Sequence, residues 1–168
     1  MSQTYSSIMQ LKKMLSNIDV WLAKAAAHAK ARKFDTNVLL QQRLAPDQYP
    51  LVRQVQSACD TAKFAAARLS GKEAPKHPDT ETTVEELHTR LESTVAYLGT
   101  FSATDFESAD ARAITLPFLE GKTMKGSDYL VEMATANFYF HAVHAYAILR
   151  HNGAELGKMD YIGALTLQ

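Results

Sequence analysis

The stretch that decides the fold is MATANFYFHAVHAYAIL, residues 133–149. It contains no Asp, Glu, Lys or Arg, although it is long enough for about four turns of an α-helix. A helix that carries no charge on any side is usually surrounded by other helices. We therefore expect this segment to be the buried member of an all-α bundle.

Three further segments have apolar residues at alternating spacings of three and four, which is the period of one helix face. These repeats begin at Ile8, Val52 and Val84. Together with the charge-free segment they predict a four-helix bundle. The expected helices, in a single domain of residues 1–168, lie at about 5–32, 48–70, 83–100 and 127–151.

The connections predict how these helices are ordered. Residues 71–81, GKEAPKHPDTE, contain two prolines and no apolar period, and when extended they are long enough to follow a whole helix. The second and third helices can then run parallel, which gives an up-down-down-up topology. Residues 112–125 alternate around Leu119-Glu120-Gly121, which predicts a small β-hairpin between the third and fourth helices.

The C-terminal tail, residues 153–168, has apolar residues at Leu156, Met159, Tyr161, Ile162 and Leu165. An exposed apolar segment of this kind indicates a docking surface. We expect the tail to pack either on its own bundle or on a second subunit. The second arrangement would make the protein a homodimer.

Composition excludes several classes of protein. Lys plus Arg equals Asp plus Glu at 18 each, so the basic excess of a nucleic-acid-binding protein is missing. The sequence contains no run of 18 apolar residues, so it predicts no membrane-spanning helix. The single cysteine, Cys59, forbids a disulfide within one chain, which favours a reducing compartment and therefore the cytoplasm.

Polar residues interrupt the charge-free helix at Asn137, His141 and His144. At about 100° per residue all three lie on one narrow arc, so we expect them to face the interior of the bundle. A buried imidazole or amide needs a partner, because an unpaired one costs about 1–3 kcal/mol. One interpretation is a polar pocket that holds a small molecule or a metal; the other is a set of core residues that satisfy one another.

Three other features carry weaker signals. Cys59 lies on the inner stripe of the second helix, where it is either a ligand or nucleophile or, more commonly, a small core residue. Asp60, next to it, is a candidate for the edge of the pocket or an ordinary surface carboxylate. Glu85-x-x-His88 matches half of a di-iron signature, but the second half is missing, so the stripe Glu85, His88, Glu92 is interpreted as a solvated face.

Three stretches resemble a bacterial family of unknown function in the DinB/YfiT-like superfamily. They are RLAPDQYPLVRQVQSACDTAKFAAARLSG at 43–71, NFYFHAVHAYAILRHNG at 137–153, and the LGKMDYIG that follows. The resemblance covers roughly residues 5–163. It implies an up-down-down-up four-helix bundle that is often dimeric.

The resemblance also implies which positions would hold a metal. Many members of the superfamily bind a divalent metal such as zinc or nickel through one histidine on the second helix and an H-x-x-x-H pair on the fourth. His141 falls at the second position of that pair and Asn137 at the first. The second helix has no histidine, and Ser57 or Asp60 lies nearest the expected position. Because Asn and Ser are poor zinc ligands, only His141 matches the pattern.

Three hypotheses about function follow. The first is a protein that binds a small molecule in a polar internal pocket. The second, suggested by metal-bearing members of the superfamily, is a metal-dependent transferase or hydrolase acting on a thiol-type substrate. The third is a structural or regulatory dimer that binds no ligand.

Overall fold

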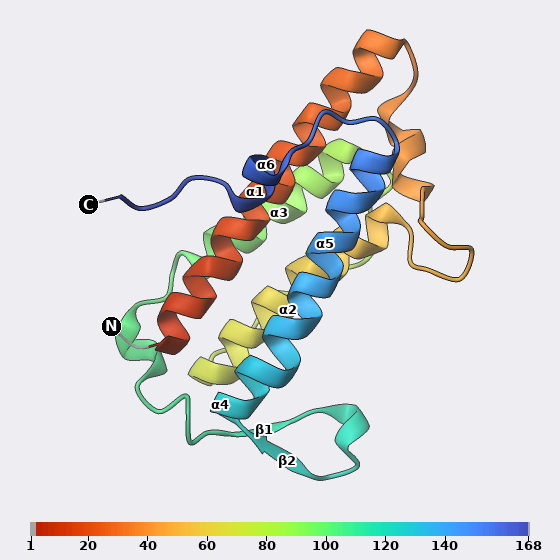
Figure 1. Ribbon diagram of the computed structural model, residues 1–168. Coiled ribbons are helices and arrows are strands. Elements are labelled where there is room, and N and C mark those ends of the chain that lie inside the picture. The colour runs from red at the N-terminus through yellow and green to blue at the C-terminus, as the bar shows by residue number, and fades with distance from the viewer. Residues whose placement is uncertain (1–2, 168) are drawn as a thin grey trace.

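A computed structural model of the protein describes residues 3–167 and is mostly helical. Four long helical stretches lie side by side in Figure 1. Three are single helices: α1 (Gln3–Arg32), α2 (Leu51–Ser70) and α3 (Val84–Leu98). The fourth is composite, with α4 (Gly126–Asp128), a π-helical segment (Tyr129–Thr135) and α5 (Ala136–His151) following one another.

The helices differ from the predicted ranges where local chemistry intervenes. The second helix begins at Leu51 and not near 48, because Pro50 is extended (φ −69°, ψ 166°) and serves as its N-cap. Its last residue is Ser70, and Gly71 follows as a left-handed cap with a positive φ of 77°, a conformation that suits glycine. The sequence does not predict the π-helical segment, because a wider turn is formed by the same types of residue as an ordinary α-helical turn.

The predicted β-hairpin between the third and fourth helices is confirmed. Strands β1 (Ala113–Thr115) and β2 (Thr123–Lys125) are antiparallel, with Ile114 opposite Met124. Gly126 follows directly, and a Cβ built on it would lie 1.9 Å from the carbonyl oxygen of Ala109. The hairpin is therefore held close to the preceding loop, at the lower end of the molecule in Figure 1.

Helix α2 packs against both α5 and α3, and α1 packs against α3 and α5. The shared core contains large side chains that are fully buried, among them Trp21, Phe106 and Phe138. Burial of side chains of this kind stabilises the fold by roughly 1.5–3 kcal/mol each. Phe138 and His141 both belong to the buried face of α5, which places the candidate histidine at the edge of this core.

The corresponding ends of α2 and α3 lie near each other. The amides of Leu51 and Val84, which begin the two helices, both bond to the segment that contains the 3-10 helix Thr36–Gln41. At the other ends, Tyr97 Oη of α3 donates to the carbonyl of Glu73, just after α2, at 2.9 Å. Between these ends the connection, residues 71–83, bonds to α3 through His77 at Ser93 and through Pro78 and Glu81 at Arg90.

Six charged side chains join α2, α3 and this connection, and we call them the ionic cluster. They are Arg53, Asp60, Lys63, Asp79, Glu81 and Arg90. Arg90 is only 4% exposed, and its nitrogens lie 2.8 Å from Asp60, 3.0 Å from Asp79 and 2.9 Å from Glu81. The cluster pairs three cations with three carboxylates, so the α3 side of α2 is neutral.

The tail packs in part on its own bundle. Helix α6 (Lys158–Ile162) lies against α1, where Trp21 Nε1 donates to the carbonyl of Asp160 and Tyr161 stacks on the Trp21 ring. Beyond it, Leu165 and Leu167 are 61% and 84% exposed. Within residues 3–167, no helix is long and apolar enough to cross a membrane.

Candidate functional site: a groove between α2 and α5

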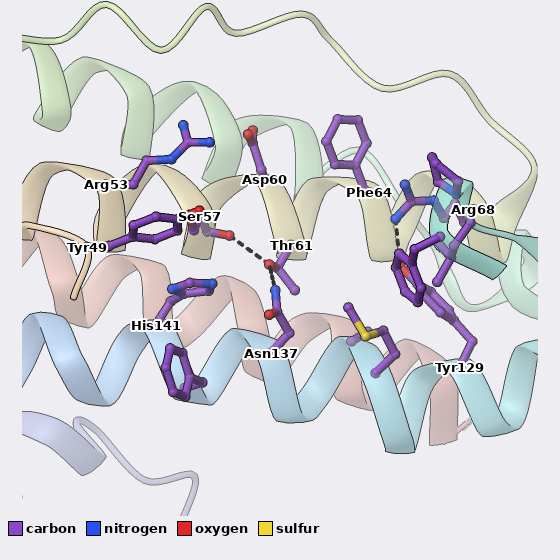
Figure 2. A pocket seen from close by; sticks show the side chains of 16 residues that line it. Tyr49, Arg53, Ser57, Asp60, Thr61, Phe64, Arg68, Tyr129, Asn137 and His141 are labelled. Carbon is purple, nitrogen blue, oxygen red and sulfur yellow. Dashed lines mark hydrogen bonds between the residues drawn. The ribbon is translucent and has the colours of Figure 1, made fainter. Parts of the chain in front are cut away.

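A groove of about 540 Å³ lies between α2 and the composite fourth helix, with the hairpin at one end. Figure 2 shows its polar side chains facing one another from the two helices. The groove is lined by residues from three places. They are Tyr49, Arg53, Ser57, Asp60, Thr61, Phe64 and Arg68 of α2 and the segment before it; Leu116, Pro117 and Phe118 of the hairpin; and Tyr129, Met133, Ala134, Asn137, Phe140 and His141 of the fourth helix.

His141 is fixed by a relay of hydrogen bonds. Gln54 donates from Nε2 to the carbonyl of Tyr49 at 3.0 Å, so its Oε1 points toward His141 Nδ1, 2.8 Å away. An amide oxygen can only accept, which assigns the proton of the imidazole to Nδ1. Nε2 is then a hydrogen-bond acceptor, and it bonds to no residue among 3–167.

His141 is also neutral at physiological pH. Its side chain is 7% exposed, and this burial lowers the pKa of His141 to about 4, with the charges of His144 and Arg53 acting in the same direction. The Tyr49 ring lies parallel to the imidazole at a centroid distance of 6.4 Å. The site therefore presents a fixed, uncharged acceptor beside an aromatic face.

Asn137 lies one turn before His141 and faces the middle of α2. Its Nδ2 donates to Thr61 Oγ1 at 2.7 Å, and the same hydroxyl donates to the carbonyl of Ser57 at 2.7 Å. These bonds orient the amide and use one of its hydrogens (Figure 2). Within the described chain its Oδ1 has no protein partner, so Asn137 offers the groove a second acceptor.

Two arginines lie toward the ends of the groove. Arg53 is paired with Asp79 of the ionic cluster and lies 5.7 Å from the centre of the Tyr49 ring. Arg68 donates from Nη1 to Tyr129 Oη at 3.0 Å and lies over the rings of Phe64 and Tyr129. The acidic residue between them, Asp60, is bound by Arg90 and Lys63 at 2.8 Å each.

The mouth of the groove is aromatic. Four rings around it are exposed to an unusual degree for their size: Tyr49 at 53%, Phe64 at 37%, Phe118 at 63% and Phe140 at 54%. A polar floor under an exposed apolar rim is typical of sites that hold an organic molecule. The π-helical segment Tyr129–Thr135 contributes to the same wall, and such segments occur frequently at functional sites.

The structure brings together three of the five residues singled out from the sequence. Asn137, His141 and Asp60 line the groove, which opens to solvent between two helices and does not lie on the bundle axis. His144 is one turn further along α5, outside the lining; its Nδ1 lies 2.6 Å from the carbonyl oxygen of Phe140. Cys59 is fully buried in the core, and burial raises the pKa of its thiol to about 12.

Sequence reasoning named Ser57 and Asp60 but missed the rest of the α2 wall. Arg53, Ser57, Thr61, Phe64 and Arg68 recur at spacings of three and four, which is itself a helical period. The apolar stripe of the same helix gives the stronger signal, because it predicts packing directly. The groove could have been predicted from this second stripe on α2 together with the absence of charge on the helix that faces it, α5.

The donor set does not fit the metal that the superfamily resemblance implies. Within residues 3–167 no three His, Cys, Asp or Glu side chains are grouped so that they could hold a metal ion. Asn137, at the first position of the histidine pair in the superfamily pattern, bonds to Thr61, and His141, at the second position, bonds to Gln54. Amide and hydroxyl groups are weak zinc ligands, so no chemical step is assigned to a metal here.

By its fold and its site the protein is a helical protein with a polar groove between two of its long helices. Residues 4–162 match the family model described as a domain of unknown function, DUF1993, and the chain belongs to this family. The chain is also similar to a Shewanella denitrificans protein whose crystal structure is described as that of a DinB family member. The two are 48% identical with a TM-score of 0.94 over 98% of this chain and 94% of that one.

These findings confirm the resemblance to a DinB-like family of unknown function. A comparison with curated proteins finds no match.

Proposed function

We propose that the protein binds a small organic molecule in the groove between α2 and α5. The observation that carries this proposal is the neutral, oriented imidazole of His141, whose Nε2 is left without a partner among residues 3–167. Nε2 is reached from the groove, because within residues 3–167 the buried side-chain nitrogen or oxygen without a hydrogen-bond partner is Nε of Arg90 and not an atom of His141. A ligand N–H or O–H group would complete this site.

Two further features support the proposal. The volume of about 540 Å³ lies in the usual range of roughly 300–1,000 Å³ for small-molecule sites. The exposed rings of Tyr49 and Phe140 flank His141, so a bound molecule would cover apolar surface that is otherwise in water. The hydrogen bonds of Gln54 and Thr61 hold the two acceptors in place before any ligand arrives.

The frame we propose for this groove is the up-down-down-up bundle. It is supported by the hydrogen bonds that join the beginnings of α2 and α3 to one segment, and by the Tyr97–Glu73 bond at their other ends. In that topology α2 and α5 run antiparallel as neighbours. Residues separated by seven positions, such as Gln54 and Thr61, can then both face the short stretch from Asn137 to His141.

The test is a search for ligands by ligand-observed NMR, using a library of small aromatic compounds that carry N–H or O–H donors. Compounds that bind the wild-type protein should bind His141→Ala at least about tenfold more weakly, a loss of about 1.4 kcal/mol. His88→Ala, on exposed α3 surface, should leave binding unchanged. Unchanged binding to His141→Ala, or no binding by any compound, would contradict the proposal.

A homodimer is a second proposal, independent of the groove. It is supported by the apolar side chains of the tail that its own bundle leaves exposed: Met159 at 62%, Leu165 at 61% and Leu167 at 84%. Burying them against a second copy would remove apolar surface from water. Light scattering should give twice the chain mass at micromolar concentration, and a monomer mass there would reject the dimer.

A further inference from the structure

Charge pairing distinguishes Arg68 from Arg53, the other cation that lines the groove, and from the nearby cations Lys63 and Arg90. Arg53 pairs with Asp79, Lys63 with Asp60, and Arg90 with three carboxylates. Arg68 lines the groove, yet no carboxylate of residues 3–167 lies within 4.0 Å of its nitrogens. Its positive charge is therefore the one in the groove wall that no described residue neutralises.

Arg68 is nevertheless held in a defined position. The phenol oxygen of Tyr129 accepts from Nη1 at 3.0 Å, and the centres of the Phe64 and Tyr129 rings lie 5.1 and 5.8 Å from the guanidinium carbon. Tyr129 is only 2% exposed and comes from the π-helical segment, so the anchor is rigid. Figure 2 shows the guanidinium and the Tyr129 ring together at one end of the groove.

An arginine held in this way keeps most of its hydrogen-bonding capacity. A guanidinium has five N–H donors, and a single bond, to Tyr129, is formed within the described residues. Its planar fork matches carboxylate, sulfonate and phosphate groups, which accept two parallel bonds. The neighbouring rings lower the local polarity, which strengthens such a pair relative to one in open water.

The distance between Arg68 and the acceptors sets the size of the ligand. Arg68 and Thr61 are seven residues apart on α2, or about 10 Å at 1.5 Å per residue, and Thr61 bonds to Asn137. The wall of the groove along this stretch is aromatic and apolar at Phe64 and Met133. A molecule of that length would have an anionic end, an apolar body and a donor at the other end.

We propose that the groove binds a small amphipathic organic anion, with its negative group on Arg68 and its apolar body along the aromatic wall. This inference rests on the proposed function and assigns its ligand class. Arg68 is a binding residue in it, and no bond is made or broken. The other end of the ligand donates to Asn137 Oδ1 or His141 Nε2.

The test compares two fluorescent probes with the same ring system, 8-anilino-1-naphthalenesulfonate, which is an anion, and N-phenyl-1-naphthylamine, which is neutral. Arg68→Gln should weaken the anionic probe at least about tenfold, or about 1.4 kcal/mol, and leave the neutral probe within about twofold. Arg68→Lys should retain much of the anion binding. Arg32→Gln removes the same charge from the exposed end of α1 and should change neither probe.

A groove-filling variant separates this inference from the proposed function. Ser57→Trp places a large ring in the middle of the lining and should displace both probes. If Ser57→Trp displaces them while Arg68→Gln leaves the anion unchanged, the anion inference fails and the groove remains a binding site. If Ser57→Trp displaces neither probe, the groove itself is refuted. Equal weakening of both probes by Arg68→Gln would also overturn the role of its charge.

Discussion

The two sides of α2 use polar residues in opposite ways. On the α3 side, the ionic cluster matches three cations with three carboxylates, and Arg90 is almost wholly buried. On the α5 side, His141, Asn137 and Arg68 are each held by one or two bonds and keep others unused within residues 3–167. The difference teaches that the pairing of charges, and not polarity, separates this structural cluster from a binding surface. Hydrogen bonding within the cluster is not complete, because Arg90 Nε is buried without a partner among residues 3–167.

The largest expected effect is on the α3 side. Arg90→Met removes the cation that three carboxylates share, and these repel one another without it. Unfolding in urea should show a loss of about 3 kcal/mol, the usual scale for breaking a buried ion pair by removing one partner. Arg68→Gln is the matched control from the α5 side and should cost about 0.5 kcal/mol or less. Equal losses in the two variants would abolish the distinction between the two sides.

The next effect concerns pH. The pKa of His141 is lowered from 6.5 to about 4 in the folded protein by burial first and then by nearby positive charge. As pH falls from 6.5 toward 4, the unfolded chain therefore takes up a proton at this residue and the folded chain does not. Stability should decrease over that window by an amount on the order of 1–3 kcal/mol.

The variant His141→Gln isolates this contribution, because it keeps a donor toward Gln54 but cannot titrate. The difference in free energy of unfolding between wild type and His141→Gln, measured from pH 7 to pH 4, should shrink as the pH falls. A constant difference across that window would show that the histidine is not held neutral.

A smaller effect is expected for the bond between Asn137 and Thr61. Replacing either residue, as Asn137→Ala or Thr61→Val, should cost about 1 kcal/mol, the usual net value of one hydrogen bond. The double variant should cost less than the sum of the two. Strict additivity in this cycle would mean that the two side chains do not act as a unit.

The smallest effect is expected at His88, on the solvated stripe. The hydrogen bond that His88 Nδ1 donates to the Asp19 carboxylate raises the pKa of His88, so any stabilisation is complete below pH 6.5 and is lost as pH rises through the raised value. The side chain is exposed, and His88→Ala should change stability by only about 0.5 kcal/mol. A loss at pH 5 as large as that of Arg90→Met would contradict the assignment of this surface as solvated.

The sequence predicts the parts of the molecule that periodicity controls. Apolar spacing located the long helices, and alternation located the hairpin at Ala113–Lys125. The absence of charge identified α5 as the helix that carries the candidate histidine. His141 is buried, because its neighbours on that helix face are core residues such as Phe138 and Ala142. The expectation that the whole charge-free segment is buried is wrong, since Phe140 and Val143 are 54% and 44% exposed.

What the sequence does not predict depends on which residues meet across helices. Gln54 and Thr61 carry no signal of their own, and their partners on α5 are fixed only when the helices pack. His144 shares its helical arc with His141 but lies one turn past the groove. The angular position of a residue on a helix does not show how far along the helix a cavity extends. Arg68 is an ordinary helical arginine until its lack of a carboxylate partner is seen in three dimensions.

The π-helical segment has a consequence for insertions and deletions. A wider turn accommodates one more residue than an α-turn, so deleting a single residue within Tyr129–Thr135 would allow the whole fourth helix to become a regular α-helix. Because the extra residue is absorbed within the wide turn, such a deletion would leave Tyr129 and the hairpin in nearly the same orientation relative to Asn137 and His141. It would remove the bulge from the wall of the groove and bring the upstream end about 1.5 Å closer. In an alignment of relatives, a one-residue gap at this place would therefore mark a loss of the bulge, with the flanking residues of the groove kept in register.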